Sequence, residues 1–148
     1  MGVLEFWQKQ GVFKKTIEQT KDGPRFVFYE GPPTANGRPG MHHVLARSFK
    51  DLFLRYKAMQ GFDQRWQNGF DCQGLWVEVN VERELGFSSK RDIEQFGLAE
   101  FVKLCKQRVL KYAAVQTQQS QRLGYWMDWN DQDQLKLLHD KLGEDQGQ

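Results

Sequence analysis

Hydrophobic positions change from a strand-like to a helix-like pattern within the stretch Arg25–Met59, around which the rest of the chain is organised. Arg25–Tyr29 is rich in β-branched and aromatic residues, which favours a short buried strand. Glu30–Gly40 holds three prolines, three glycines and an Asn-Gly pair, so it predicts a turn. From Met41 apolar residues recur every three or four positions up to Gly61, which predicts a helix ended by a glycine. The apolar positions of this helix are Leu45, Phe49, Leu52, Phe53 and Tyr56.

The segment after this helix predicts a second strand at Phe62–Gln67. If that strand runs parallel to the first, the strand, the helix and the strand form a βαβ unit with a right-handed crossover. The turn-rich segment Asn68–Gly74 then lies at the carboxyl end of the second strand, where open α/β sheets bind their ligands. The pattern therefore predicts the α/β fold class with parallel strands.

The flanking segments favour helices. Val3–Gln19 carries an amphipathic pattern interrupted at Gly11, which predicts two short helices. The residues 89–92 form a capping-box pattern, which predicts a short helix over Lys90–Phe96. Leu98–Leu123 is the longest periodic segment, and it predicts a long helix with one apolar face.

Three further segments have mixed patterns. Leu75–Leu85 alternates its valines as a strand does while its leucines and glutamates also fit a helix, and residue propensity favours the strand. Gly124–Trp129 carries three large aromatic residues, which predict a buried segment. Asn130–Gln148 is acidic and rich in glutamine, and we expect either a polar tail or a truncation point.

The composition indicates in which cellular compartment the protein works and which classes of partner it can bind. The chain has 148 residues, 39% of them hydrophobic, and a net charge of +2, which suits one soluble domain without the basic field of a nucleic-acid-binding protein. No apolar run approaches the roughly 20 residues that a membrane span needs. Cys72 and Cys105 are too few and too far apart for a zinc or redox site. We expect a soluble, cytoplasmic protein with no membrane association and no metal held by its own residues.

Basic residues nevertheless cluster around the central helix. Such a cluster can contact phosphates, but it also fits a solvated helix face with local ion pairs. Both interpretations stay open. The members of this basic cluster are Arg38, Arg47, Lys50, Arg55, Lys57 and Arg65.

The loop before the central helix has the composition of a phosphate-binding loop. A helix N-terminus offers N–H groups and a partial positive charge, and glycines let an anion approach the backbone. His42 and His43 lie on the first turn of the helix, where an imidazole can donate a hydrogen bond to a phosphate oxygen. Because adjacent helical side chains point about 100° apart, only one of the two can easily face a given ligand atom. The alternative is that one histidine packs and the other caps the helix.

Asp71 is a candidate ligand for a positively charged group. It lies in the turn-rich segment between Gly69 and Gly74, where a carboxylate can hold an ammonium group by a charge-assisted hydrogen bond. The alternative is an Asx-turn or a helix cap.

Two motifs together resemble the start of class I aminoacyl-tRNA synthetases, most closely the isoleucyl-tRNA synthetases. YEGPPTANGRPGMHHV covers residues 29–44, and GFDCQGLWVEVNVERELGFSSKRDIEQFG covers residues 69–97. In that family a strand, a GPP-x-A-x-G loop and the HIGH motif (H-x-G-H) open a Rossmann-like catalytic domain, and a G-W-D-x-H-G-L-P-x-E segment follows. The leucyl and valyl relatives share the first motif, whereas the stretch Gly69–Glu78 of the second motif is more similar to the isoleucyl enzymes. The resemblance covers nearly the whole chain.

The resemblance implies a role for each residue that matches. The expected catalytic residues are His43, which matches the last histidine of the HIGH motif, and His42. Pro32 and Pro33 match the loop that lines the amino-acid pocket, and Asp71 matches the carboxylate that holds the substrate ammonium group. The resemblance also implies a helix at Leu75–Leu85, which we adopt. The expected ATP-binding residues are Gly40, Met41, His42 and His43.

Three features depart from the family pattern. Gly40 and His42 have exchanged places relative to H-x-G-H, a form that some isoleucyl enzymes carry, so His42 must turn away from the adenine ring or stack on it. Gln73 and Trp76 replace the usual His and Pro of the second motif. No KMSKS-like lysine loop is present in the chain.

The resemblance implies activation of isoleucine with ATP and transfer to tRNA(Ile), with ATP and Mg²⁺ as cofactors and a monomeric full-length enzyme. Residues 1–24 would form an N-terminal helical segment, 25–129 the first half of the Rossmann-like catalytic domain, and 130–148 the tail. Without the second half, the chain is expected to be inactive or nearly so alone. Two alternatives remain: a standalone RNA- or nucleotide-binding module derived from a synthetase, and a truncated reading frame with no independent role.

Overall fold

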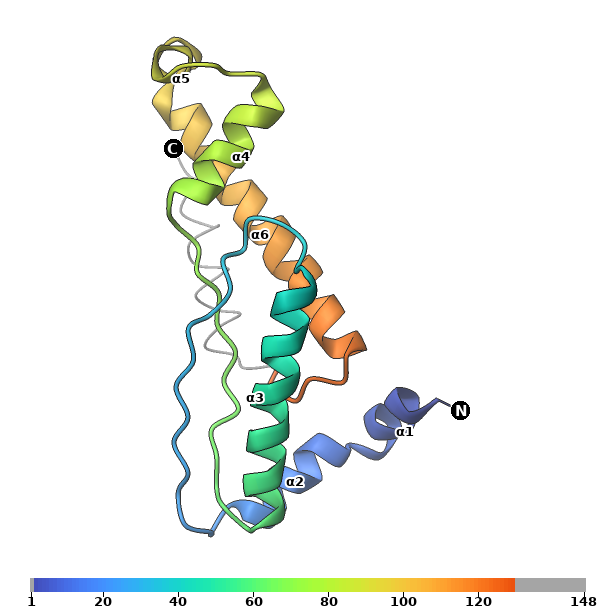
Figure 1. Ribbon diagram of the computed structural model, residues 1–148. Helices are drawn as coiled ribbons and strands as arrows, with labels where there is room; N and C mark the ends of the chain where they lie inside the picture. Colours follow the sequence, from blue (N-terminus) through green and yellow to red (C-terminus); the bar gives the residue numbers. More distant parts are fainter. Residues whose placement is uncertain (1, 130–148) are drawn as a thin grey trace, which may run out of the picture. The chain divides into compact units, whose positions relative to one another are not determined.

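The computed structural model describes residues 2–129, and this part of the chain contains six α-helices (Figure 1). None of these helices is long and apolar enough to cross a membrane. The expected tail or truncation point at 130–148 lies outside the described residues. The helices are α1 (Val3–Gln10), α2 (Val12–Thr20), α3 (Met41–Met59), α4 (Leu75–Leu85), α5 (Lys90–Phe96) and α6 (Leu98–Arg122).

The described chain divides into two compact units. Unit 1 comprises residues 2–31, Pro39–Asn68 and Gln119–Trp129. Unit 2 comprises Pro32–Arg38 and Gly69–Gln118. Unit 1 therefore holds α1, α2 and α3, and unit 2 holds α4, α5 and most of α6.

The predicted α/β fold class is wrong for residues 2–129, because this part of the chain contains no strand and thus no Rossmann-like βαβ unit. The segments expected as strands are extended connections before and after α3 (Figure 1). They form only isolated parallel bridges, Arg25 with Asp63 in unit 1 and Thr34 with Asp71 in unit 2.

In the described part of the chain a sheet does not form because these segments have too few neighbouring strands to pair with. Parallel strands are normally buried on both faces within a larger sheet, and two strands alone are marginally stable. In unit 1 the side chains of Val27 and Tyr29 are 56% and 90% exposed. Their apolar surface therefore contributes little of the burial that would stabilise a strand.

The predicted helices are confirmed. Gly11 adopts φ 58°, which separates α1 from α2 as expected. Asp92 accepts hydrogen bonds from the backbone N–H groups of Ser88 and Ser89 at 2.8 Å each, which stabilises the start of α5. The segment Leu75–Leu85 is the helix that the resemblance implied, and the strand favoured by propensity is wrong.

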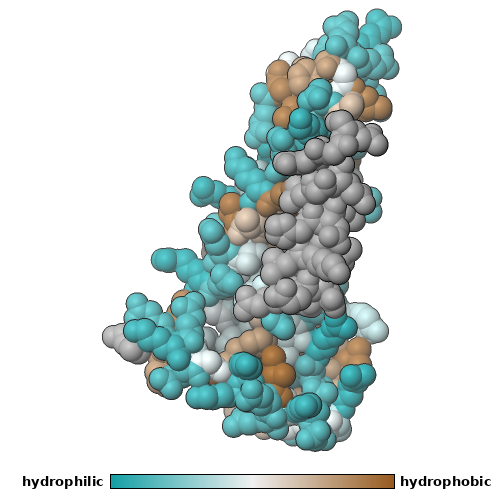
Figure 2. Space-filling view, turned by 180° about the vertical axis from the view of Figure 1, so that it is seen from behind, coloured by the Kyte–Doolittle hydropathy of each residue, from teal (hydrophilic) through white to brown (hydrophobic). Residues whose placement is uncertain are grey.

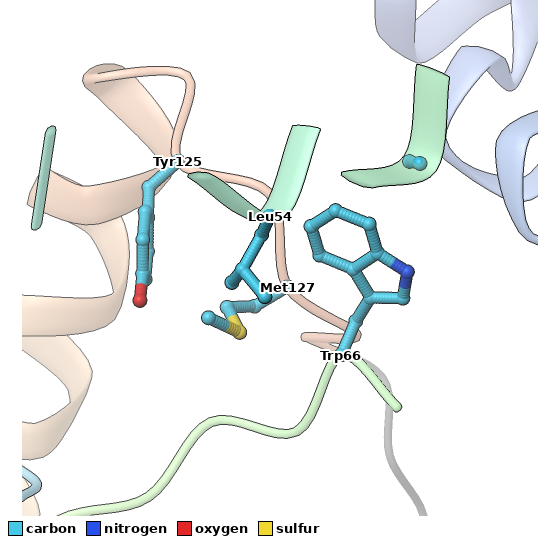
Figure 3. Packing of buried hydrophobic residues seen from close by; sticks show 5 residues of the cluster. Leu54, Trp66, Tyr125 and Met127 are labelled. Carbon is cyan, nitrogen blue, oxygen red and sulfur yellow. The ribbon is translucent and has the colours of Figure 1, made fainter. Parts of the chain in front are cut away.

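The core of unit 1 is aromatic. Leu54 and Met127 lie between the rings of Tyr125 and Trp66 (Figure 3), and all four are 4% exposed. Phe13 from α2 meets Trp66 edge-to-face at 5.6 Å between ring centroids. Of the three aromatic residues in Gly124–Trp129, Tyr125 is buried as predicted, whereas Trp126 and Trp129 are partly buried; all three pack with Leu54 and Ala58 of α3.

The core of unit 2 joins a loop to two helices. Val77 of α4 packs with Val109 and Ala113 of α6 and with Ala35, which is 0% exposed. Val77 and Val81 are buried four positions apart on one face of α4, so packing decides the helix against β propensity. The loop 32–38 is thereby anchored to the core by Ala35. On the face shown in Figure 2, the visible described residues are mostly hydrophilic, and hydrophobic residues form separate patches.

Candidate functional site

The start of α3 in unit 1 is closed by hydrogen bonds between Gly40 and His43. The backbone N–H of His43 donates to the Gly40 carbonyl at 3.1 Å. In the reverse direction the Gly40 N–H donates to Nδ1 of His43 at 3.0 Å. This is one half of a capping box, in which an imidazole replaces the usual Glu or Gln and accepts the N–H of the N-cap residue. The bond restrains the His43 ring at the helix N-terminus.

This bond also decides which nitrogen of His43 carries the proton. Because Nδ1 accepts a hydrogen bond, the neutral ring has its proton on Nε2. Burial lowers the pKa of His43 below its ordinary value of 6.5, and the charges of His42 and Arg47 lower that pKa further. At neutral pH the ring is therefore uncharged and offers one N–H donor, which a phosphate oxygen can accept.

The two histidine rings lie together. Their centroids are 3.9 Å apart, and the planes are inclined by 40°, contrary to the expectation that adjacent helical side chains diverge. A Cβ atom at Gly40 would lie 3.1 Å from Cε1 of His42. The exchange of Gly and His relative to the family pattern is thus compatible with the local packing, because the glycine leaves room for the His42 imidazole. Met41, the fourth residue expected to bind ATP, is 84% exposed.

Arg47 points into unit 1 rather than toward a ligand. Its side chain is 5% exposed, it donates a hydrogen bond to Oγ of Ser120, and its guanidinium lies 5.4 Å from the ring centroid of Tyr125. Burial lowers the pKa of Arg47 and raises the pKa of Tyr125. The Tyr125 hydroxyl lies 3.3 Å from Oε2 of Glu30, which also pairs with Nζ of Lys50 at 3.1 Å.

The side chains of Arg55 and Lys57, like that of Arg47, contact residues of unit 1. Nε of Arg55 lies 2.6 Å from Oδ2 of Asp51, and its guanidinium is 3.9 Å from the ring centroid of Trp126. Arg55 also donates to the carbonyl of Gly124. Nζ of Lys57 is 4.8 Å from the ring centroid of Phe62. Within the basic cluster, the four cations of α3 therefore contact residues of their own unit, as the interpretation with local pairs expected.

Asp71 in unit 2 is held by four hydrogen bonds to its backbone and side chain. Oδ2 accepts the Thr34 hydroxyl at 2.8 Å, and Oδ1 accepts the Gln73 N–H at 3.2 Å. The second bond is an Asx-turn, which was the alternative role considered for this residue. The backbone N–H of Asp71 donates to the Pro33 carbonyl at 3.0 Å, and its carbonyl accepts from Ala35 at 2.9 Å. The carboxylate is fixed beside the Pro-Pro loop.

Two residues of α6 hold this loop, and sequence analysis missed both. Nε2 of Gln116 donates to the carbonyls of Thr34 and Gly37, at 3.0 Å and 2.9 Å. Nε of Arg108 donates to the Asn36 carbonyl at 2.9 Å, while Nη1 lies 2.6 Å from Oε1 of Glu84. The sequence did contain a signal for Gln116, because this residue falls on the apolar face of a periodic helix. A polar side chain at such a position needs a buried hydrogen-bond partner.

The expected site residues therefore form two groups. Gly40, Met41, His42 and His43 lie together in unit 1. Pro32, Pro33 and Asp71 lie together in unit 2. Gly69 lies close to Pro32, because a Cβ atom placed on Gly69 would be 3.7 Å from the Cβ of Pro32. Trp76, at the position of the family's proline, is 62% exposed. No group of three His, Cys, Asp or Glu residues within 2–129 is arranged to hold a metal ion.

Comparison with known proteins confirms the resemblance. The chain matches the family described as tRNA synthetases class I (I, L, M and V) over residues 2–144. It is 54% identical to the isoleucine–tRNA ligase of Dehalococcoides mccartyi (strain ATCC BAA-2266 / KCTC 15142 / 195) over 126 residues, which are 85% of this chain and 12% of that protein. It is 52% identical to the isoleucine–tRNA ligase of Thermobifida fusca over 129 residues, which are 87% of this chain and 12% of the relative.

The corresponding enzyme of Thermus thermophilus is 46% identical over 126 residues, again 85% of this chain and 12% of the relative. The chain thus spans about an eighth of the length of the curated relatives that it matches. The family match extends over nearly all 148 residues. The chain therefore belongs to the class I aminoacyl-tRNA synthetase family.

Proposed function

We propose that this chain is the segment of an isoleucyl-tRNA synthetase that contributes contacts to ATP and to isoleucine. The whole enzyme would activate isoleucine with ATP and transfer it to tRNA(Ile). The identity to isoleucine–tRNA ligases and the match to the class I family support this function. The observation that carries the proposal is the hydrogen bond from the Gly40 N–H to Nδ1 of His43, because it leaves Nε2 as the donor.

The chemical task of the first group is to stabilise negative charge. In the activation step the substrate carboxylate attacks the α-phosphate in line, and the enzyme mainly positions the phosphates and stabilises their charge. The start of α3 supplies a partial positive charge, His43 supplies an N–H donor, and His42 adds a second imidazole 3.9 Å away. Mg²⁺ would arrive with ATP as the ion that neutralises its phosphates.

The task of the second group is to hold the amino acid. An ionised carboxylate has about four acceptor positions. The Thr34 hydroxyl and the Gln73 N–H each occupy one position on Asp71. The remaining lone pairs can accept hydrogen bonds from an ammonium group. Pro32 and Pro33 would provide apolar contacts beside it, as the family pattern implies.

The alternative of a standalone RNA-binding module has less support. That hypothesis depends on the basic cluster being presented to a polyanion. Arg47 and Arg55 instead contact Ser120 and Asp51, and Lys50 contacts Glu30. These contacts favour the synthetase function over the RNA alternative, because three cations of α3 are paired within unit 1.

Isothermal titration calorimetry with ATP and with a non-hydrolysable isoleucyl-adenylate analogue tests the proposed function. We expect weak binding of both by the wild-type chain. The variant His43→Gln should weaken both, because it removes the imidazole donor but keeps a side chain that can cap Gly40. The variant Asp71→Asn should weaken the adenylate analogue and leave ATP unchanged. Equal binding by the wild type and both variants would refute the proposal, and RNA binding with a steep salt dependence that both variants retain would favour the alternative.

A further inference from the structure

The carboxylate of Asp71 is held by two hydrogen-bond donors of different origin. Oδ1 accepts the backbone N–H of Gln73 at 3.2 Å, within the same turn, whereas Oδ2 accepts the Thr34 hydroxyl at 2.8 Å, from 37 residues away in the sequence. The terminal torsion of an aspartate side chain is broad, so a carboxylate held at one oxygen can still swing about that bond. The Thr34 hydroxyl, bonded to the other oxygen, therefore fixes the plane of the carboxylate.

Thr34 is itself fixed in place. The backbone on both sides of it bonds to Asp71, because the Asp71 N–H donates to the Pro33 carbonyl at 3.0 Å and the Ala35 N–H donates to the Asp71 carbonyl at 2.9 Å. The carbonyl of Thr34 accepts a hydrogen bond from Nε2 of Gln116 at 3.0 Å. Threonine is also β-branched, which restricts its χ1 angle. The hydroxyl consequently reaches Asp71 from a rigid support.

The Thr34 hydroxyl is not required to hold the loop 32–38. The two backbone bonds to Asp71 and the bonds from Gln116 do not involve the hydroxyl. The side chain of Ala35 anchors the same loop in the core of unit 2. Replacing the hydroxyl by a methyl group of similar size would leave all of these contacts in place. What the hydroxyl alone supplies is the orientation of the carboxylate.

We propose that Thr34 is a positioning residue for the ammonium group of the amino acid, and that it acts through Asp71. With one donor on each oxygen, the carboxylate keeps about two of its four acceptor positions, and the hydroxyl determines the direction in which these positions face. An ammonium group then meets a preorganised acceptor, which avoids the entropy cost of ordering the side chain on binding. The inference rests on the proposed function, because it takes Asp71 as the carboxylate that binds the ammonium group.

Calorimetry with a matched pair of ligands tests the inference. The first ligand is a non-hydrolysable sulfamoyl analogue of isoleucyl-adenylate, and the second is the same molecule with hydrogen in place of the ammonium group. Both are titrated into the 148-residue chain and into the variants Thr34→Val, which removes the hydroxyl but keeps the shape, and Thr34→Ser, which restores a hydroxyl. Asp71→Asn reports the carboxylate itself. Thr117→Val on α6 of unit 2 makes the same substitution outside the loop 32–38 and is the control.

We expect Thr34→Val to weaken binding of the ammonium-bearing ligand about tenfold, the effect of losing one well-oriented charge-assisted hydrogen bond. The same variant should bind the second ligand as the wild type does, because that ligand has no group for Asp71 to hold. Thr34→Ser and Thr117→Val should bind both ligands within about twofold of the wild type.

An equal loss of both ligands in Thr34→Val would assign the hydroxyl to the structure of the loop and overturn the inference. Full binding by Thr34→Val together with weakened binding by Asp71→Asn would also overturn it, while the proposed function would stand. If the wild-type chain binds neither ligand, or binds both equally, then Asp71 does not hold an ammonium group. The proposed role of Asp71 is then wrong, and the inference is wrong with it.

Discussion

His43 and Gly40 share two hydrogen bonds at the start of α3: the Gly40 N–H donates to ring Nδ1 of His43 at 3.0 Å, and the backbone N–H of His43 donates to the Gly40 carbonyl at 3.1 Å. One side chain thereby caps α3 and keeps its second ring nitrogen as a donor. Structural and ligand-binding roles of this histidine can be separated by substitution, because capping needs only an acceptor whereas the proposed phosphate contact needs the donor.

The capping role predicts a difference between two variants. His43→Ala removes the acceptor for the Gly40 N–H, and we expect the free energy of unfolding to fall by about 1 kcal/mol, the usual cost of losing a cap. His43→Gln should restore most of that loss, since Gln is a regular capping-box residue at this position. Urea unfolding followed by far-UV circular dichroism measures both. Identical destabilisation by the two variants would show that the bond does not stabilise the helix.

The same histidine predicts a pH dependence of stability. Its pKa in the folded chain is lowered, mainly by burial, below the ordinary value of 6.5. The unfolded chain therefore takes up the proton first as the pH falls. The contribution of neutral His43 is complete above about pH 6.5 and is lost as the pH falls through the folded pKa. Between pH 7 and 5 the urea midpoint should decrease more for the wild type than for His43→Gln. Parallel curves would contradict this prediction.

The buried pair of Arg47 and Ser120 predicts a coupled loss of stability. Ser120→Ala removes an acceptor of a guanidinium that is 5% exposed, and we expect a cost of about 1–3 kcal/mol. Arg47→Met should also destabilise the chain, because the aromatic segment loses its contact with the guanidinium. The double variant should cost less than the sum, since both single changes remove the same bond. Strict additivity in urea unfolding would argue against the pair.

The anchoring of the loop 32–38 predicts a selective effect of Gln116→Glu. The carboxylate would face the carbonyls of Thr34 and Gly37 in place of a donor. We expect a loss of about 1–3 kcal/mol and faster amide hydrogen exchange at Ala35, whose N–H bonds to Asp71. Gln118→Glu, two residues away and exposed, is the matched control. An unchanged exchange rate at Ala35 in the first variant would refute the anchoring role.

The local sequence predicted the helices because their signals are local. Gly11 interrupts one pattern, and the acidic Asp92 caps another, within a few residues of the elements that they define. The prediction of the two strands was wrong because a strand depends on residues distant in the sequence. Arg25–Tyr29 has strand-like composition, but a strand also requires partners, and within the described residues it finds one bridge, from Arg25 to Asp63.

The direction in which α3 faces could not be predicted from periodicity. The spacing of Phe49 and Phe53 identifies an apolar face but does not say whether the chain covers it. Here the buried side is chosen by Arg47 and its contact with Ser120, which is 73 residues away. In the candidate site, the motifs located His43 and Asp71, whereas Gln116 depends on contacts 79 and 82 residues away.

The most direct test of the central claim is a two-dimensional NMR titration of the isotopically labelled chain with ATP. The backbone amides of Gly40 and His43 and the Nε2 resonance of His43 should shift with increasing ATP. Adenosine, which lacks the phosphates, should shift them much less. If saturating ATP leaves these three resonances unchanged, or if adenosine reproduces the ATP shifts, then the start of α3 does not bind the phosphates and the proposed function is wrong.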